Sequence, residues 1–135
     1  MSTYSGRCYC GAITWQSDAD VLWAGHCHCE SCRRAAPADF VSWIGFPRAE
    51  VDWSGESMKI RQTSPGVERG HCATCGTAMY YRNVRWPTEI HLYAATLNDP
   101  TLYQPKAHYH WDERLPWTVA SDDLPRYVGH GDLAD

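Results

Sequence analysis

The sequence contains no long run of apolar residues. Its first ten residues, MSTYSGRCYC, lack the apolar stretch of a secretory signal. No window approaches the ~20 apolar residues that a membrane-spanning helix requires. We therefore expect a cytoplasmic protein that does not associate with a membrane.

Positive charge is also scarce. Twelve Lys and Arg residues against sixteen Asp and Glu residues give a formal net charge of −4 with His neutral. A protein with this charge gains little by neutralising phosphate groups, so we expect no nucleic-acid partner. The pair Arg33 and Arg34 remains compatible with a small anionic ligand.

Helical periodicity, internal repeats and linkers are absent as well. With 135 residues, 44% of them apolar, the chain is expected to form one domain over residues 1–135. Apolar residues recur with period two, which favours strands. The expected strands are residues 12–17, 38–46, 58–63, 77–83 and 88–97, and the expected loops are 46–57, 63–70 and 98–105. One helical turn is expected between Cys32 and Pro37. The fold class is therefore mainly β with few short helical turns.

Cysteine, by contrast, is abundant and clustered. The seven cysteines form three groups: Cys8 and Cys10; Cys27, Cys29 and Cys32; Cys72 and Cys75. Cysteines that merely filled a core would be scattered along the chain. An odd number of thiols in C-x-C and C-x-x-C spacing favours metal ligation, with zinc the best match, over a disulfide framework.

Glycine placement divides the cysteines into two sites. Gly11 follows Cys10 and Gly76 follows Cys75. A glycine just after a ligating cysteine lets the chain turn with φ > 0 and directs backbone N–H groups at the sulfur. We therefore pair the first group with the last and expect a structural zinc ligated by Cys8, Cys10, Cys72 and Cys75.

The middle group supplies three thiolates and is followed by Arg33 instead of glycine. Three protein ligands describe a zinc with an open position, which a substrate could fill. Such a centre is a poor generator of hydroxide but suits the capture of a thiol. A thiolate held there could attack a small aldehyde to give a hemithioacetal. We therefore interpret Cys27, Cys29 and Cys32 as ligands of a second, catalytic zinc.

Several neighbours of this group have open roles. His26 or His28 could supply a fourth ligand, although a hydrogen-bonding role is favoured for His28. Arg33 is the candidate for binding a substrate carboxylate, and Trp43 is the candidate for lining a substrate pocket. The segment with His108, His110 and Trp111 alternates like a strand, which favours a packing role for these side chains.

The cysteines lie in three motifs, GRCYCG, CHCESCRR and HCATCGTAMYYR, and three further segments follow downstream, ATLNDP, QPKAHYHWDERLPW and SDDLPRY. Together they resemble the motifs of the glutathione-dependent formaldehyde-activating family, which includes the centromere-protein-V-like proteins. The resemblance covers roughly residues 4–128. It implies a β-tent-like (Mss4-like) fold stabilised by zinc and the same two zinc sites. It also implies a carbon–sulfur lyase activity like that of S-(hydroxymethyl)glutathione synthase, with glutathione and formaldehyde as reactants.

Two departures from the family pattern accompany this resemblance. His71 stands where the family usually has Phe. The segment RRAAPADF, beside the second zinc site, lacks a glycine that the family often has there, and this second departure bears on the glutathione pocket. The alternative function is a non-catalytic zinc module that carries a thiol or binds a protein. A zinc deaminase is rejected, because no proline precedes the last C-x-x-C and the helices it requires are not indicated.

Overall fold

Strands make up most of the regular structure in the computed structural model, which describes residues 3–55 and 58–131. The strands are β1 (Tyr4–Arg7), β2 (Ile13–Ser17), β3 (Trp23–Cys27), β4 (Val41–Pro47), β5 (Asp52–Gly55), β6 (Met58–Ser64), β7 (Val67–Cys72), β8 (Ala78–Asn83), β9 (Glu89–Tyr93) and β10 (His108–Tyr109). The helix α1 spans Glu30–Ala35, and 3-10 turns cover Arg48–Glu50, Ala94–Thr96, Pro100–Leu102 and Trp111–Glu113. The chain is thus a mainly β single domain with few short helical turns, as the sequence predicts.

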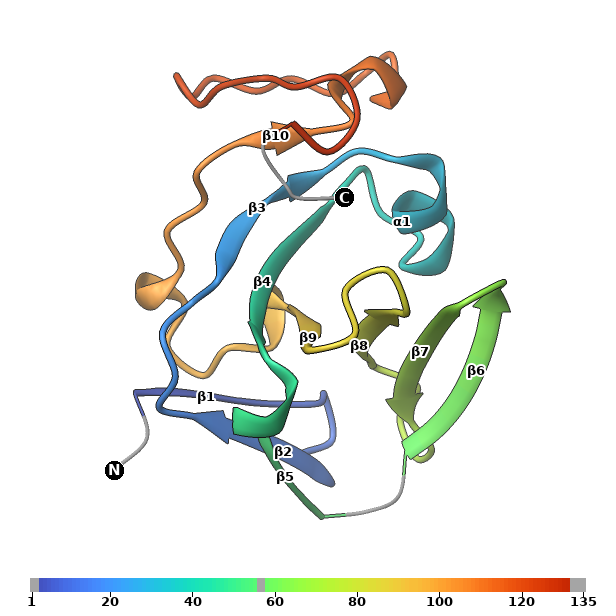
Figure 1. Ribbon diagram of the computed structural model, residues 1–135, viewed down its shortest axis with the longest axis vertical. Coiled ribbons are helices and arrows are strands. Elements are labelled where there is room, and N and C mark those ends of the chain that lie inside the picture. Colours follow the sequence, from blue (N-terminus) through green and yellow to red (C-terminus); the bar gives the residue numbers. More distant parts are fainter. Residues whose placement is uncertain (1–2, 56–57, 132–135) are drawn as a thin grey trace.

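The strands belong to two sheets within these described ranges. The small sheet has the order β1-β2-β5, and the large sheet has the order β10-β3-β4-β9-β8-β7-β6. The pair β10–β3 is parallel, and the other pairs of the large sheet are antiparallel. In Figure 1 the small sheet lies at one end of β3 and β4, and the segment around β10 lies at the other end. No helix among the described residues is long and apolar enough to cross a membrane.

The strands expected at residues 12–17, 38–46, 58–63 and 77–83 are present with shifted ends. The expected strand 88–97 ends at Tyr93, where a 3-10 turn begins. Two expected loops are wrong in part. β5 lies inside 46–57, and residues 56–57 of that loop fall outside the described ranges; β7 begins inside 63–70. A strand forms at β7 despite its glycine because Gly70 lies beneath the ring of Tyr80 on β8, where any Cβ would clash with that ring.

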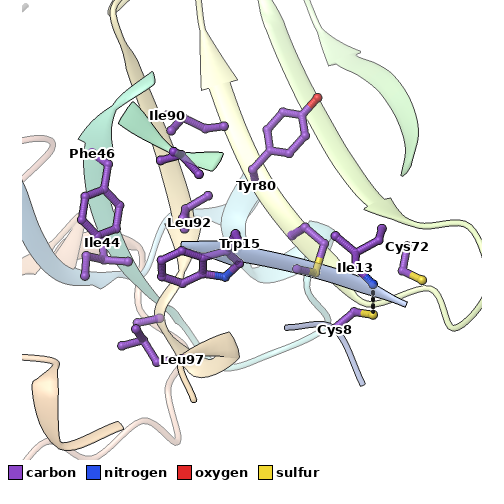
Figure 2. Close-up of a cluster of buried hydrophobic side chains, with 13 residues drawn as sticks. Cys8, Ile13, Trp15, Ile44, Phe46, Cys72, Tyr80, Ile90, Leu92 and Leu97 are labelled. Carbon is purple, nitrogen blue, oxygen red and sulfur yellow. Dashed lines mark hydrogen bonds between the residues drawn. The ribbon is translucent and has the colours of Figure 1, made fainter. Parts of the chain in front are cut away.

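The principal core lies between the two sheets and extends to a group of cysteines. Along β2 the side chains alternate, so Ile13 and Trp15 are buried while their neighbours are exposed. These two residues pack in one cluster with Phe46, and Figure 2 shows Cys8 and Cys72 beside Ile13 at one side of that cluster. The apolar core therefore holds Cys8 and Cys72, which are 64 residues apart in the sequence, side by side.

The helix α1 starts earlier than the sequence predicts. The expected turn followed Cys32, but α1 begins at Glu30, because the Sγ of Cys29 accepts a hydrogen bond from the backbone N–H of Cys32 (3.3 Å) and caps the helix. Glu30 and Arg34 add an ion pair at 2.7 Å on the exposed side of the helix. The cap places Cys29 and Cys32 on one side of this turn.

Candidate metal centres and cavity

Four cysteines from two distant segments of the chain converge at one end of the core. The sulfurs of Cys8, Cys10, Cys72 and Cys75 all lie within 4.8 Å of one another. The Sγ atom of Cys10 lies 3.6 Å from the Sγ atom of Cys8 and 3.8 Å from that of Cys72. Four sulfurs at the Zn–S distance of about 2.3 Å would be about 3.8 Å apart, so this four-cysteine cluster fits a tetrahedral zinc ion.

Glycine turns shape both halves of the four-cysteine cluster. Gly11 has φ of 81° and Gly76 has φ of 80°, the left-handed conformation expected after each C-terminal cysteine. The Sγ of Cys72 accepts hydrogen bonds from the backbone N–H groups of Thr74 and Cys75, each at 3.4 Å. N–H groups that point at a sulfur stabilise its thiolate form, which is the form that binds metal.

Cys75 has an additional donor. The hydroxyl of Thr77 donates to the Sγ of Cys75 at 3.1 Å, and this bond, with further backbone donors, lowers the pKa of Cys75 to about 5. A thiol with a pKa near 5 is ionised at neutral pH. The four-cysteine cluster is thus prepared to bind a cation.

The middle group forms a second, separate cluster. The sulfurs of Cys27, Cys29 and Cys32 lie within 4.8 Å of one another at the end of β3 and the start of α1. Among the described residues, no further His, Cys, Asp or Glu joins this three-cysteine cluster. The donor set fits a metal ion such as zinc with one position left for another ligand.

Negative charge in the three-cysteine cluster is concentrated on one sulfur. Hydrogen bonds from the thiols of Cys27 and Cys32 lower the pKa of Cys29 to about 2. The same close contacts raise the pKa of Cys27. Three acidic groups this close share their protons, so the first charge appears at Cys29 and the other two thiols stabilise it.

Neither nearby histidine is grouped with the three sulfurs. His26 forms a hydrogen bond through Nδ1 with the Oγ of Ser42 at 2.8 Å. His28 is fully buried, and its Nε2 lies 2.8 Å from Nδ1 of His108. Both side chains therefore have hydrogen-bonding partners away from the three-cysteine cluster. The alternating pattern around β10 favoured a packing role for His108 and did not reveal its hydrogen bond with His28.

A cavity of about 400 Å³ opens beside the three-cysteine cluster. Its walls come from β3, α1, β4, β7, β8, β9, β10 and the segments that follow β8 and β10. Most of its lining side chains are aromatic or polar: Trp23, Cys27, Cys29, Glu30, Ser31, Cys32, Trp43, Arg69, Tyr81, Asn83, Trp86, His91, Tyr109, His110, Glu113 and His130. A ligand in this cavity would reach all three sulfurs.

The two residues that the sequence predicted to contact substrate, Trp43 and Arg33, line different hollows of the structure. Trp43 lines the cavity, is buried, and donates from Nε1 to the Sγ of Cys32 at 3.4 Å. Arg33 lines a different hollow beside Leu115 and Trp117, and its Nε donates to the backbone oxygen of His28 at 3.2 Å. The arginine that lines the cavity is Arg69 from β7.

Two further residues also face the cavity: His110, for which the strand-like alternation had favoured a packing role, and Glu113, which the sequence patterns did not single out. His110 has φ of 53° and leaves the line of β10, so its ring is not part of the strand alternation. Its Nδ1 lies 2.9 Å from Oε2 of Glu113. This pair offers an imidazole and a carboxylate for moving a proton near the three sulfurs.

Comparisons with known proteins agree with this geometry. The model of the family described as glutathione-dependent formaldehyde-activating enzyme matches residues 3–113. A Halomonas elongata protein, provisionally named a glutathione-dependent formaldehyde-activating enzyme, is 29% identical over 114 residues, which are 78% of this chain and 71% of that protein. An uncharacterized lyase of Schizosaccharomyces pombe is 30% identical over 81 residues, which are 60% of this chain and 58% of that protein.

A solved structure shares the fold. The crystal structure of a Rhodobacter sphaeroides protein superposes with a TM-score of 0.60 and covers 91% of this chain and 99% of that chain. Its sequence is 18% identical, so the likeness concerns the fold alone.

Proposed function

Because the chain belongs to the family of glutathione-dependent formaldehyde-activating enzymes, we propose that it is a zinc-dependent carbon–sulfur lyase-type enzyme. Its substrates are adducts of a small thiol, such as glutathione, with an aldehyde. The structural zinc belongs to the four-cysteine cluster, and the catalytic zinc belongs to the three-cysteine cluster. The names of the two relatives, a formaldehyde-activating enzyme and a lyase, support this reaction class.

One observation carries the proposal: the three sulfurs line a cavity and have no fourth protein ligand among the described residues. A zinc ion bound there would supply one open position that takes up a substrate thiol and favours its thiolate form. The aromatic side chains Trp23, Trp43 and Trp86 form part of the wall around this position.

The reaction itself needs one bond and one proton transfer. In the direction of synthesis, the substrate sulfur forms a bond to the carbonyl carbon, and the thiol proton ends on the carbonyl oxygen. Lysis reverses both steps. His110, oriented by Glu113, is the cavity-lining group that takes the thiol proton and returns it to the oxygen. Cys29 and its two neighbours hold the metal throughout.

The test combines metal counting, thiol binding and turnover. Native mass spectrometry of the purified protein should give two zinc ions per chain and a one-to-one adduct with glutathione or another small thiol. Exchange spectroscopy with the same thiol and formaldehyde should show accelerated hemithioacetal exchange. Cys29→Ser should abolish both the adduct and the acceleration while the far-UV circular dichroism stays unchanged.

Two results would contradict the proposal. One zinc ion per chain would remove the catalytic centre. Two zinc ions with thiol binding but no acceleration for any aldehyde would leave a metal-stabilised module that carries a thiol.

A further inference from the structure

Arg69 holds an uncompensated positive charge at the wall of the cavity. Its Nε donates to the Oγ1 of Thr63 at 3.2 Å, and its Nη1 donates to the hydroxyl of Tyr93 at 3.4 Å. Its guanidinium carbon also lies 4.9 Å from the centre of the Tyr81 ring. Among the described residues, no carboxylate forms an ion pair with Arg69, and it is the single Lys or Arg that lines the cavity.

These contacts fix the guanidinium without neutralising it. A surface arginine ordinarily keeps its rotamer freedom, and fixing the side chain costs conformational entropy. The three contacts of Arg69 are to two hydroxyls and an aromatic face, all uncharged. A fixed cation that faces a cavity and has no carboxylate in contact with it is arranged to bind an anion, and guanidinium matches carboxylate best because it can bind both oxygens.

A rigid aromatic layer connects Arg69 to the three-cysteine cluster. Trp43 donates to the sulfur of Cys32, and its ring centre lies 4.3 Å from that of Tyr93 and 5.7 Å from that of Tyr81. The same two tyrosines contact Arg69. The sulfur position and the guanidinium are therefore linked through one set of packed rings and line the same cavity.

The remaining formal charges on the cavity wall are negative. Glu30 and Glu113 line the cavity, and Glu113 also accepts a hydrogen bond from the backbone N–H of Glu30 at 3.1 Å. A carboxylate on the ligand would therefore be attracted to Arg69 and repelled by these two glutamates, whereas an ammonium group on the ligand would be attracted to them.

We propose that Arg69 binds the carboxylate of the substrate thiol, so that the cavity prefers thiols that carry a carboxylate over thiols that lack one. This inference rests on the proposed thiol chemistry and names the substrate class for that site. Arg69 is then a specificity-determining residue that contacts substrate at the end opposite the sulfur.

The test compares thiols that differ in one charge. N-acetylcysteine and N-acetylcysteine amide share the thiol and nearly the same volume, but only the first has a carboxylate. Calorimetric titration of the zinc-loaded protein should show that N-acetylcysteine binds at least about tenfold tighter than the amide, as expected for a charge-assisted pair.

Matched arginine variants assign the preference to one side chain. Arg69→Gln should reduce the ratio of the two affinities to about one, and Arg69→Lys should retain part of it. Arg61→Gln is the control, because Arg61 is the cross-strand partner of Arg69 on β6 and is exposed outside the cavity. It should leave the ratio unchanged.

The outcomes separate this inference from the proposed function. Thiol binding with no preference for the carboxylate, or a preference that survives in Arg69→Gln, would overturn the role of Arg69 and leave the lyase proposal intact. Failure of every thiol to bind would overturn both proposals together.

Discussion

The Nε2 atom of His28 lies 2.8 Å from the Nδ1 atom of His108, and both rings are buried. On its other side, Nε2 of His108 lies 3.0 Å from Oδ2 of Asp122. A carboxylate accepts, so His108 donates from Nε2 and accepts at Nδ1 in its neutral form. His28 must then donate from Nε2, which leaves a lone pair on its Nδ1, an atom that is buried and without a hydrogen-bond partner.

This assignment predicts that His28 stays neutral well below the ordinary histidine pKa. Burial, followed by the charge of the nearby His108, lowers the pKa of His28 to about 4. Long-range proton–nitrogen correlation spectra should show one His28 signal with Nε2 protonated and Nδ1 bare from pH 8 to pH 5. A His28 ring that takes up a second proton near pH 6.5 would contradict the assignment.

The lowered pKa of His28 also predicts how the free energy of unfolding depends on pH. The unfolded chain protonates His28 near pH 6.5, whereas the folded chain protonates it near 4. Unfolding therefore takes up a proton between these values, and the contribution of His28 to stability is lost as the pH falls through this range. Urea unfolding should show a weaker pH dependence in His28→Gln than in the original protein between pH 7 and 5.5. Metal content must be equal in the compared samples, since acid also protonates the thiolates.

Asp122 should stabilise the fold through His108. Asp122→Ala leaves the buried Nε2–H of His108 without its acceptor, so we expect the melting temperature to fall by roughly 5 °C. Asp123→Ala is the matched control. The carboxylate of Asp123 is next to Asp122 in the sequence and is exposed, so its removal should leave the melting temperature unchanged. Equal effects of the two substitutions would mean that general surface charge, not the contact with His108, determines the result.

The two cysteine clusters should respond differently to serine substitution. Cys75→Ser removes a ligand that joins β7 to the N-terminal segment, and structural zinc contributes on the order of 10 kcal/mol to the folding of small domains. We expect this variant to be unfolded and to bind less zinc. Cys29→Ser should lose one zinc ion and keep the strands. Circular dichroism and metal analysis of both variants distinguish the clusters; a folded Cys75→Ser with full metal content would mean that the four-cysteine cluster is not structural.

The sequence predicted the parts of the site that depend on local spacing. Cys27, Cys29 and Cys32 lie close in the chain, so their convergence follows from the turn that α1 makes. The pairing of distant cysteines was also predictable, because Gly11 and Gly76 mark the same kind of turn. The strands were predicted where apolar residues alternate, as in β2, where the burial alternates residue by residue.

Contacts across the large sheet were not predictable in this way. Arg33 follows Cys32 in sequence, but the direction of the helix turns its side chain to another hollow, while Arg69 reaches the cavity from β7. The segment of Arg69 was expected to be a loop, because its charges and Gly70 obscure a strand whose pairing with β6 and β8 decides its conformation. His28 and His108 are eighty residues apart, and only the parallel pairing of β3 with β10 brings them together.

Gly76 gives a direct test of the turn that shapes the four-cysteine cluster. Its φ of 80° is costly for alanine, whereas a Cβ built there has no atom within 4 Å, so the effect of Gly76→Ala comes from the backbone alone. We expect a loss of about 1 kcal/mol in the free energy of unfolding, a smaller loss for Gly76→Asn, and faster release of zinc to a chelator.

Gly129 supplies the matched control for this prediction. It has φ of 65° and equally open surroundings, but it lies outside both cysteine clusters. Gly129→Ala should therefore carry a similar backbone cost and leave the rate of zinc release unchanged. If the two alanine variants released zinc at the same rate, the turn at Gly76 would matter only for folding, and the N–H groups directed at Cys72 would not depend on it.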